Sequence, residues 1–368
     1  MLADCLAGLR VLDLSMYIPG PLATLWLSDL GAEVIKVEGP AGDPMRTMGP
    51  VDADGTTPFY KLANRNKTVV GLDLKTEEGK RLFARMIGGA DVLLDGFRPG
   101  VLGRLGFGEA ALAELNPRLV TCRLSGYGGT GPFADRAGHD VTYLAASGML
   151  AATGPAERPL MPYPPLADHA GAMLAVNAIL AALLRRGATG KGATIDVSLA
   201  EAALSWMSGV LTAGRRWGGP AREADLINGG AAHYRIYRTK DGRFAAIAAL
   251  EDKFWQSFCA AIGHPEWIHR HDEPLPQTAL IADMEALFAS RSLAEWTAVL
   301  EPANCTFEPV LEPAEVPFHP HHRARDFVHV GDDGIVDVLL PIMMEGARVR
   351  LRRPFTEQSA EEVLSGWR

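Results

Sequence analysis

The sequence contains few cysteines, no cluster of basic residues and no long uninterrupted apolar run. Its four cysteines, Cys5, Cys122, Cys259 and Cys305, lie far apart without Cys-x-x-Cys spacing, which favours reduced cytoplasmic thiols over a disulfide framework or a zinc site. The net charge of -8 argues against a surface that neutralises nucleic-acid phosphates. Charged residues are 22% and hydrophobic residues 48% of the 368 positions, which excludes disordered, collagen-like and coiled-coil chains.

The chain also lacks an obvious membrane segment. The most apolar stretch, residues 170–184, is interrupted by Asn177 and ends at two arginines, short of the roughly 20 residues that cross a bilayer. The first ten residues include Asp4 and Arg10 and no apolar run typical of a secretion signal. We therefore expect a cytoplasmic protein with no membrane partner, and we expect residues 170–184 to form a buried core helix.

Apolar runs rich in β-branched residues alternate with helical patterns along the first two hundred residues. This alternation predicts βαβ units and a Rossmann-like α/β domain with a parallel sheet over residues 1–208. We expect strands at 11–14, 34–37, 92–94, 119–124 and 194–197, and helices at 23–30, 77–86 and 112–115.

The second part of the chain predicts a smaller α+β domain over residues 233–317. Residues 209–232, rich in Gly, Arg and Ala without periodicity, are predicted to be a linker. The Asp241-Gly242 turn indicates a hairpin, and residues 318–368 are expected to return to the large domain. The predicted elements are strands at 234–237, 244–248, 336–343 and 349–351, and helices at 254–262, 280–290 and 293–300.

A glycine-rich loop, Gly126–Gly131, fits the pattern GxGxxG after a predicted strand. Pro132 follows it instead of a helix start, and no acidic residue stands at the distance that a ribose requires, so a dinucleotide site is disfavoured. These glycines are expected to allow a tight turn or a close approach to a ligand. Gly126 and Tyr127 are therefore candidate ligand contacts.

Two titratable residues stand at the starts of helical segments. His139 is either a base with a neutral imidazole or a structural histidine. Asp168 precedes the apolar helix and is either its N-cap or a partly buried acid, whose pKa burial would raise towards a value useful for proton transfer.

Basic and histidine-rich loops give two further indications. The histidines at 269–271 and 319–322 lack the spacing of metal ligands, and we expect no metal site. Basic residues in loops near predicted strands of the α/β domain together indicate a phosphorylated ligand: Arg46, Arg65, Lys67 and Arg98.

Many ordered motifs resemble those of the family III CoA transferases (CaiB/BaiF-like) and their racemase relatives, over essentially the whole chain. They include Pro19-Gly20-Pro21, the run from Leu30 to Glu38, Gly42-Asp43-Pro44-Met45-Arg46, Asn64-Arg65-Asn66-Lys67, Phe97-Arg98-Pro99-Gly100, Ser125-Gly126-Tyr127-Gly128 and Gly190-Lys191-Gly192.

The resemblance separates two branches at the site. Gly138-His139-Asp140 is similar to the motif of the α-methylacyl-CoA racemases, in which the His is one of two bases. Asp168 matches an Asp that is the second base in racemases and the nucleophile in transferases, and Glu251 matches a Glu that the small domain of the other subunit supplies. The segment before Asp168 is shorter than in racemases, which resembles some transferases.

The resemblance thus implies an isomerase of lipid metabolism that epimerises 2-methylacyl-CoA thioesters by two-base proton transfer through an enolate. The alternative is a CoA transferase that forms an acyl-enzyme at Asp168. It further implies an interlocked homodimer and no cofactor beyond the CoA of the substrate. The implied catalytic residues are His139, Asp168, Glu251 and Asp140, and the implied CoA contacts are Arg46, Arg65, Lys67, Arg98, Tyr127 and Gly126.

Overall fold

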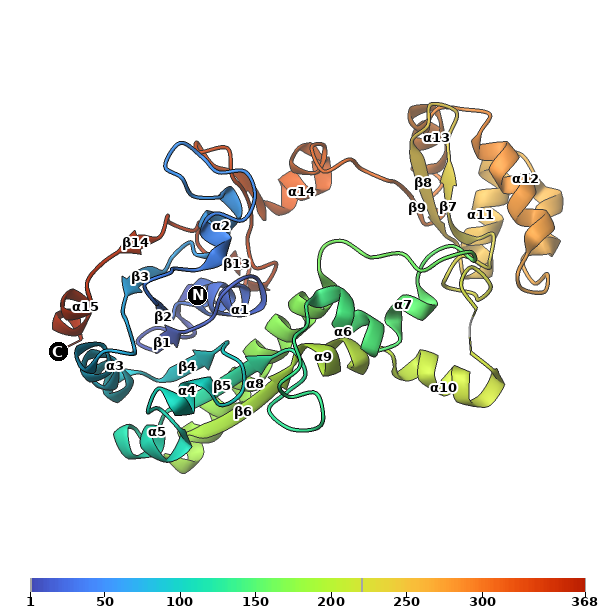
Figure 1. The fold of residues 1–368 in the computed structure, drawn as a ribbon. Helices are drawn as coiled ribbons and strands as arrows, with labels where there is room; N and C mark the ends of the chain where they lie inside the picture. The colour runs from blue at the N-terminus through green and yellow to red at the C-terminus, as the bar shows by residue number, and fades with distance from the viewer. Residues whose placement is uncertain (1, 220, 368) are drawn as a thin grey trace. The chain divides into compact units, whose positions relative to one another are not determined.

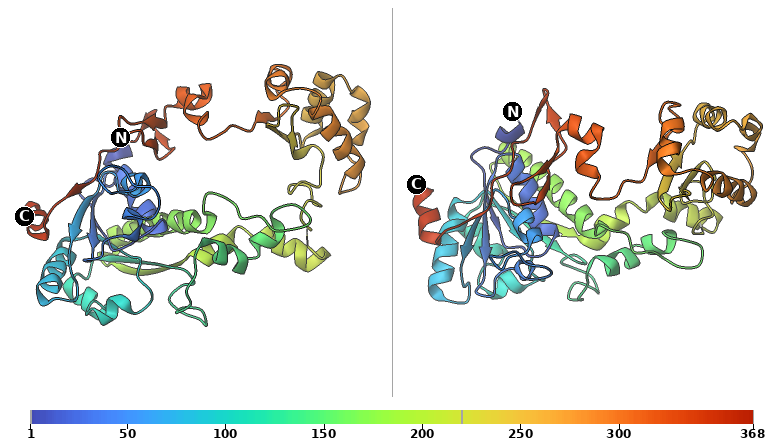
Figure 2. Two further views of the ribbon diagram at one scale, coloured as in Figure 1. Left: turned by 45° about the horizontal axis from the view of Figure 1, so that its top comes forward. Right: turned by 90° about the horizontal axis from the view of Figure 1, so that it is seen from above.

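A computed structural model describes residues 2–219 and 221–367 and groups the chain into two compact units (Figures 1 and 2). The large unit comprises Met1–Ser147, Tyr163–Ser205 and Pro317–Arg368, and the small unit comprises Gly148–Pro162 and Trp206–Val316. The segment expected as a linker, 209–232, groups with the small unit and contains most of helix α10 (Ser208–Trp217). Pro220 of the expected linker lies outside the described residues, as do Met1 of the expected large domain and Arg368 of the expected return segment.

The large unit is built on a seven-stranded sheet in the order β14-β3-β2-β1-β4-β5-β6, in which every neighbouring pair is parallel. The predicted parallel α/β architecture is therefore confirmed. Two strands, β3 and β14, were not expected, because each is short and has no strong apolar run. The strands are β1 (Arg10–Asp13), β2 (Glu33–Glu38), β3 (Thr68–Gly71), β4 (Val92–Asp95), β5 (Val120–Ser125), β6 (Ala193–Ser198) and β14 (Thr356–Glu357).

Helices cover both faces of this sheet, as parallel sheets require. On one face, α3, α5 and α15 share a core with Leu12, Ile35 and Val70 of the strands. On the other, α1 packs against β1 and β2, and α8 packs against β5, β6 and α1. The helices are α1 (Pro19–Asp29), α2 (Pro58–Ala63), α3 (Glu77–Gly89), α4 (Val101–Arg104), α5 (Glu109–Leu115), α6 (Asp140–Ala146), α8 (Leu166–Thr189), α9 (Leu199–Ser205), α14 (Pro320–Arg325) and α15 (Ala360–Gly366).

Helix α8 is longer than its sequence suggested. It has 24 residues and passes a test for membrane spans by length and apolar composition, so the expectation that this segment is too short for a bilayer is wrong. The polar residues at both ends of the apolar stretch continue the helix instead of ending it. One face is buried through small side chains such as Ala167, Ala172 and Ala175, while Leu184 is exposed.

The small unit contains an antiparallel sheet of β7 (Tyr234–Arg238), β8 (Phe244–Ala248) and β9 (Phe307–Pro309). Gly242 takes a φ of 79° in the predicted turn between β7 and β8. Trp255, Phe258 and Trp296 are buried in its core. The helices are α7 (Met149–Ala152), α10, α11 (Asp252–Ile262), α12 (Thr278–Phe288) and α13 (Leu293–Leu300).

The final segment returns to the large unit, where β14 pairs with β3. Arg352, buried with its side chain 2% exposed, lies 2.6 Å from Asp29 at the end of α1. The other strands of this final segment are β10 (Val328–Val330), β11 (Val336–Val338), β12 (Met343–Met344) and β13 (Ala347–Arg348). The strand expected at 349–351 is wrong for this described stretch, since β13 ends at Arg348 and residues 349–351 form no strand.

Candidate active site

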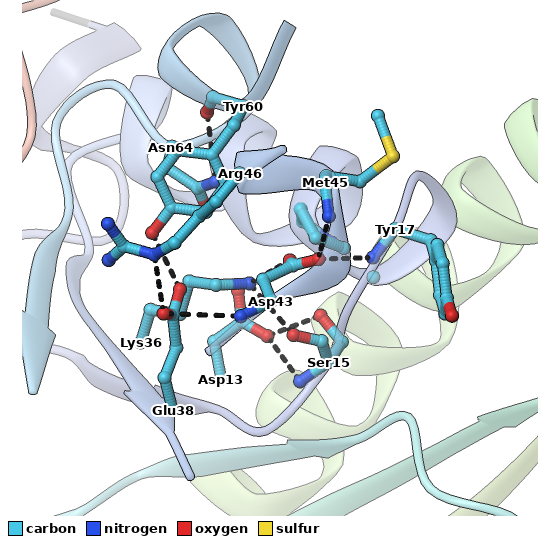
Figure 3. A network of polar contacts seen from close by, with 12 residues as sticks. Asp13, Ser15, Tyr17, Lys36, Glu38, Asp43, Met45, Arg46, Tyr60 and Asn64 are labelled. Carbon is cyan, nitrogen blue, oxygen red and sulfur yellow. Dashed lines mark hydrogen bonds and ion pairs between the residues drawn. The ribbon is translucent and has the colours of Figure 1, made fainter. Parts of the chain in front are cut away.

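A buried polar network occupies the carboxyl ends of the first strands of the large unit (Figure 3). Asp13, at the end of β1, accepts hydrogen bonds from the Ser15 hydroxyl, from Thr24 Oγ1 at 2.6 Å and from Lys67 Nζ at 3.2 Å. Burial alone would raise the pKa of Asp13, but the ammonium groups of Lys67 and Lys36 together with the hydroxyl donors lower this pKa to about 2. Asp13 is therefore a structural anion with Lys67 as its counter-ion.

A second ion pair holds the loop after β1. Lys36 Nζ lies 2.9 Å from Asp43 Oδ2, both side chains are fully buried, and the same ammonium donates to the Ser15 carbonyl at 2.8 Å. Asp43 Oδ1 accepts from the amides of Tyr17 at 3.2 Å and Met45 at 3.0 Å (Figure 3). The pair thus fixes the backbone from Ser15 to Tyr17 against the segment that follows β2.

Two of the predicted CoA contacts serve this internal framework. Besides Asp13, the fully buried Lys67 ammonium has two more oxygen acceptors, at 2.8 and 3.1 Å. Arg65 lies 2.9 Å from Asp333 and 2.8 Å from Asp337 of the return segment. Because a buried charge needs a partner at hand, both cations neutralise carboxylates of the chain, and we do not retain them as CoA contacts.

The other two basic candidates are more accessible. Arg46 also pairs with two carboxylates, since Nε lies 2.8 Å from Glu38 Oε2 and Nη2 lies 3.0 Å from Glu357 Oε1. Its side chain is nevertheless 26% exposed, against 8% for Arg65, and the guanidinium stands 4.4 Å from the centre of the Tyr60 ring. Arg46 lines a surface cavity of about 670 Å³ between the loop after β2 and β14. Arg98, in the loop after β4, is exposed, and its side chain has no hydrogen bond or ion pair within residues 2–219 and 221–367. Arg46 and Arg98 remain candidate contacts for phosphates.

The glycine-rich loop after β5 packs against an aromatic cluster. A Cβ on Gly126 would overlap the Tyr143 hydroxyl, and one on Gly138 would lie 2.5 Å from Tyr143 Cε1. The Tyr143 hydroxyl donates to the Gly138 carbonyl at 2.6 Å. Tyr127 stands edge-on to Tyr143, at 5.1 Å between ring centres, and to Phe133, at 5.5 Å. These two glycines therefore admit the Tyr143 ring, a role that the motif alone did not indicate.

His139 and Asp168 lie at the starts of helices α6 and α8, and the carboxylate of Asp140 in α6 binds the first turn of α8. His139 is the N-cap of α6, and its imidazole is exposed. Asp140 Oδ1 accepts from the amides of Ala167 at 2.7 Å and Asp168 at 3.2 Å, in the first turn of α8. Asp140 therefore caps α8, and the alternative that Asp168 is itself the N-cap is wrong.

The electrostatics of Asp168 differ from those of an ordinary surface acid. Burial, with a smaller contribution from the negative charge of Asp140, raises the pKa of Asp168 to about 7. Burial and the charge of Asp168 raise the pKa of Tyr143 to about 12. At neutral pH the Tyr143 hydroxyl keeps its proton, whereas Asp168 is divided between its acid and carboxylate forms.

The residue after Asp168 marks the edge of an apolar cavity. His169 Nδ1 donates to the Pro165 carbonyl at 2.6 Å, so the other ring nitrogen is the one free to face the cavity. The cavity has a volume of about 320 Å³, and its walls come from α1, α2, α8 and the return segment. Most of its lining is apolar, and it includes Ile18, Leu22, Trp26, Leu62 and Val338 beside His169.

The remaining predicted residue, Glu251, belongs to the small unit. It is the N-cap of α11 and is exposed. Among the described residues no three His, Cys, Asp or Glu side chains are grouped as metal ligands would be.

Sequence reasoning did not single out Tyr17 and Tyr143 as site residues. Tyr143 follows His139 by four residues, which is about one helical turn, and this spacing was a usable signal. Tyr17 precedes Pro19-Gly20-Pro21 in a loop, where nothing in the sequence shows which way the side chain points.

Comparisons with known proteins agree with this architecture. The model of CoA-transferase family III matches residues 6–357. The chain belongs to this family. A CAIB/BAIF family protein from Brucella suis superposes with a TM-score of 0.86 and 28% identity over 99% of both chains. A hypothetical protein from Mycobacterium tuberculosis gives 0.82 and 29% over 97% of both.

Curated relatives of this family III chain carry out two kinds of reaction, by their names. Human alpha-methylacyl-CoA racemase is 33% identical over 98% of this chain and 92% of its own. The acetyl-CoA:oxalate CoA-transferase of Acetobacter aceti is 34% identical over 92% and 89%, and the succinyl-CoA:glutarate CoA-transferase of Mus musculus is 32% identical over 84% and 73%. The chain is an enzyme of this superfamily, and identity alone does not single out racemase or transferase.

Proposed function

We propose that this enzyme epimerises 2-methylacyl-CoA thioesters by moving the α-proton between His139 and Asp168. The observation that carries the proposal is the joint between α6 and α8. Asp140 follows His139 directly and binds the amide of Asp168 at 3.2 Å, so one residue links the two candidate bases within the large unit.

The proton transfer can be written with these two groups alone. The Asp168 carboxylate takes the α-proton from one face, and the electron pair of the C–H bond moves onto the thioester oxygen to give an enolate. Protonated His139 then returns a proton to the opposite face, which inverts the centre, and the other epimer reacts in reverse. A carboxyl with a pKa of about 7 suits this exchange, because general acid–base catalysis is most efficient when the pKa of the catalytic group lies near the working pH.

Stabilisation of the enolate needs donors other than the first amides of α8. Those of Ala167 and Asp168 are occupied by Asp140. The CoA phosphates need a separate positive charge. Arg98 is exposed, and it lowers the pKa of Tyr143 electrostatically, so it carries positive charge close to the aromatic cluster. We propose that Arg98 and Arg46 hold the CoA phosphates, and that Gly126 and Tyr127 lie along the pantetheine.

The apolar cavity supports an apolar acyl group. Ile18 and His169 line it, and each directly follows a residue beside the reacting centre, Tyr17 and Asp168. Its volume of about 320 Å³ falls within the range of small-ligand pockets. An aliphatic chain would fill it. A second carboxylate would lose its hydration there, because Arg352, which also lines the cavity, is already paired with Asp29 and Asp337.

The alternative is CoA transfer, in which Asp168 attacks the thioester carbonyl and expels CoA thiolate to form a mixed anhydride. The named transferases among the relatives favour it. The raised pKa of Asp168 argues against it, since a nucleophile works best when fully ionised.

The family resemblance also leads us to propose a homodimer in which Glu251 of one subunit completes the site of the other. Co-expression of a His139→Ala chain with a Glu251→Ala chain should then give hybrid dimers with one intact site and partial activity. Homodimers of each variant are expected to be inactive. We further propose a cytosolic location and no cofactor beyond the CoA of the substrate.

One experiment separates the two reactions. A single epimer of a 2-methylacyl-CoA is incubated in deuterated water without an acceptor acid, and both deuterium uptake at the α-carbon and epimerisation are followed. We expect both, and we expect His139→Ala to reduce epimerisation by at least about 100-fold while CoA affinity is unchanged. His321→Ala, at an exposed histidine outside the site, is the matched control. Absence of exchange combined with CoA transfer to an added acid would replace the proposal with the alternative.

A further inference from the structure

Tyr17 has an unusual backbone conformation. Its φ is 65°, in the left-handed region that glycine enters freely and that a bulky side chain enters only at an energetic cost. The residue is 37% exposed, so burial of the side chain does not account for this conformation. An aromatic residue at a position suited to glycine therefore needs another explanation.

The conformation is imposed by the buried ion pair beneath the loop. Asp43 Oδ1 accepts the Tyr17 amide at 3.2 Å, and Asp43 is itself locked by fully buried Lys36 at 2.9 Å. Lys36 also binds the Ser15 carbonyl at 2.8 Å. Figure 3 shows the Tyr17 side chain leaving this network, with its amide held inside it. The buried Lys36–Asp43 pair thus maintains the strained backbone of Tyr17.

The strained backbone places the Tyr17 ring against the candidate base. The rings of Tyr17 and His139 stand edge to face, with centres 6.3 Å apart and planes at 82°. This is a favourable aromatic geometry. His139 is exposed at the N-cap of the short helix α6, so the Tyr17 ring is a neighbour that limits how the exposed imidazole can turn.

We propose that Tyr17 is a positioning residue that orients the His139 imidazole for proton transfer on its face of the substrate. The inference rests on the proposed epimerase function. It accounts for the strain, since backbone strain persists where the surrounding structure imposes it and where function gains from it. It also assigns the Lys36–Asp43 pair a purpose, which is to hold the loop that carries this ring.

The test measures deuterium uptake from each epimer separately, because Asp168 and His139 serve opposite faces. Tyr17→Gly removes the ring and tolerates the backbone conformation, so the chain should fold. We expect exchange from the epimer that His139 deprotonates to slow by roughly 10- to 100-fold. Exchange from the other epimer and KM should change by less than about two-fold. Tyr17→Phe keeps the edge contact and should behave as the wild type.

Equal slowing of both epimers, an unaffected Tyr17→Gly enzyme, or a Tyr17→Phe enzyme as slow as Tyr17→Gly would each overturn the inference. Wild-type enzyme that exchanges neither epimer would refute the proposed function instead. The positioning is then read by NMR from the ring protons of His139, assigned by their loss in His139→Gln. Their chemical shifts should move in Tyr17→Gly and not in Tyr17→Phe, and unmoved shifts in Tyr17→Gly would end the inference.

Discussion

Replacement of Asp140 by Asn should lower the pKa of Asp168 while leaving helix α8 capped. The Asn side-chain oxygen can accept the same two amides, of Ala167 and Asp168, that Asp140 accepts at 2.7 and 3.2 Å. Asn and Asp are about equally good N-cap residues. The substitution therefore removes one negative charge from beside Asp168 with little change in structure.

The size of the effect can be set from Coulomb's law. Two like charges about 6 Å apart repel by about 3 kcal/mol at an effective dielectric constant of about 20. Partial exposure of both carboxyls reduces this to about half, and 1.4 kcal/mol corresponds to about one pH unit. Since burial is the larger cause of the raised pKa, we expect a fall of about one unit, with the pKa of Asp168 still above its ordinary value.

The assay is the pH dependence of kcat/KM for deuterium uptake from the epimer that Asp168 deprotonates. In the wild type, the rate should rise through a pKa near 7 as the carboxylate forms, and in Asp140→Asn this limb should lie about one pH unit lower. Asp140→Ala is the control that loses both the charge and the cap, and it should also lose about 1 kcal/mol of stability. An unmoved or raised limb in Asp140→Asn would refute the assignment of that limb to Asp168.

The same coupling predicts how stability depends on pH. The folded chain binds a proton at Asp168 up to a pH of about 7, whereas the unfolded chain releases it near 3.8. Between these values the folded state holds more protons, so the contribution of Asp168 to the free energy of unfolding falls as pH rises. Urea unfolding at pH 5 and pH 8 should show a loss that is smaller in Asp140→Asn by about 1 kcal/mol. An equal loss in both proteins would contradict the coupling.

Two further pairs of variants test the structural roles assigned above. Lys67→Met should lower the free energy of unfolding by about 3–5 kcal/mol, because it leaves the buried Asp13 carboxylate without its counter-ion. Arg98→Ala should instead weaken CoA binding without a change in urea unfolding. A Lys67→Met protein that stays stable but binds CoA more weakly would reverse our assignment. Gly126→Ala should cost about 1–3 kcal/mol because its Cβ meets Tyr143, while Gly187→Ala, where a Cβ meets nothing within 4 Å, should be neutral or slightly stabilising in the same assay.

The regular parts of the fold could be predicted from the sequence because their patterns are local. Alternation of apolar strands and helices indicated the parallel sheet, and Asp241-Gly242 indicated the hairpin. Strand β3 has only four residues, Thr68–Gly71, and exists because β2 and β14 flank it on both sides. Helix α8 begins before its apolar stretch because Asp140, which lies far from it in the sequence, caps its first turn. Long-range partners of this kind leave no signal in a single segment.

The site divides in the same way. His139 and Asp168 could be singled out by their places at helix starts, but their link through Asp140 depends on a contact across 28 residues. The basic residues cannot be told apart in this way. Lys67 and Arg98 both stand in loops near strand ends, yet Lys67 is buried and Arg98 is exposed. What distinguishes them is the carboxylate at the end of β1, since a buried Asp13 requires a cation and Lys67 is the one that reaches it.

The need of buried Asp13 for a cation helps to explain how one fold can serve both racemases and CoA transferases. The framework of Asp13, Lys67, Lys36 and Asp43 fixes the loop after β1 whatever the chemistry, and its charges are neutralised internally. The reaction then depends on the few groups outside the framework. An Asp168 that is half protonated at neutral pH transfers protons well and attacks a carbonyl poorly, and burial together with the neighbouring charge of Asp140 sets that balance. Changes near the first turn of α8 could therefore move a chain of this family between proton transfer and acyl transfer without altering the fold.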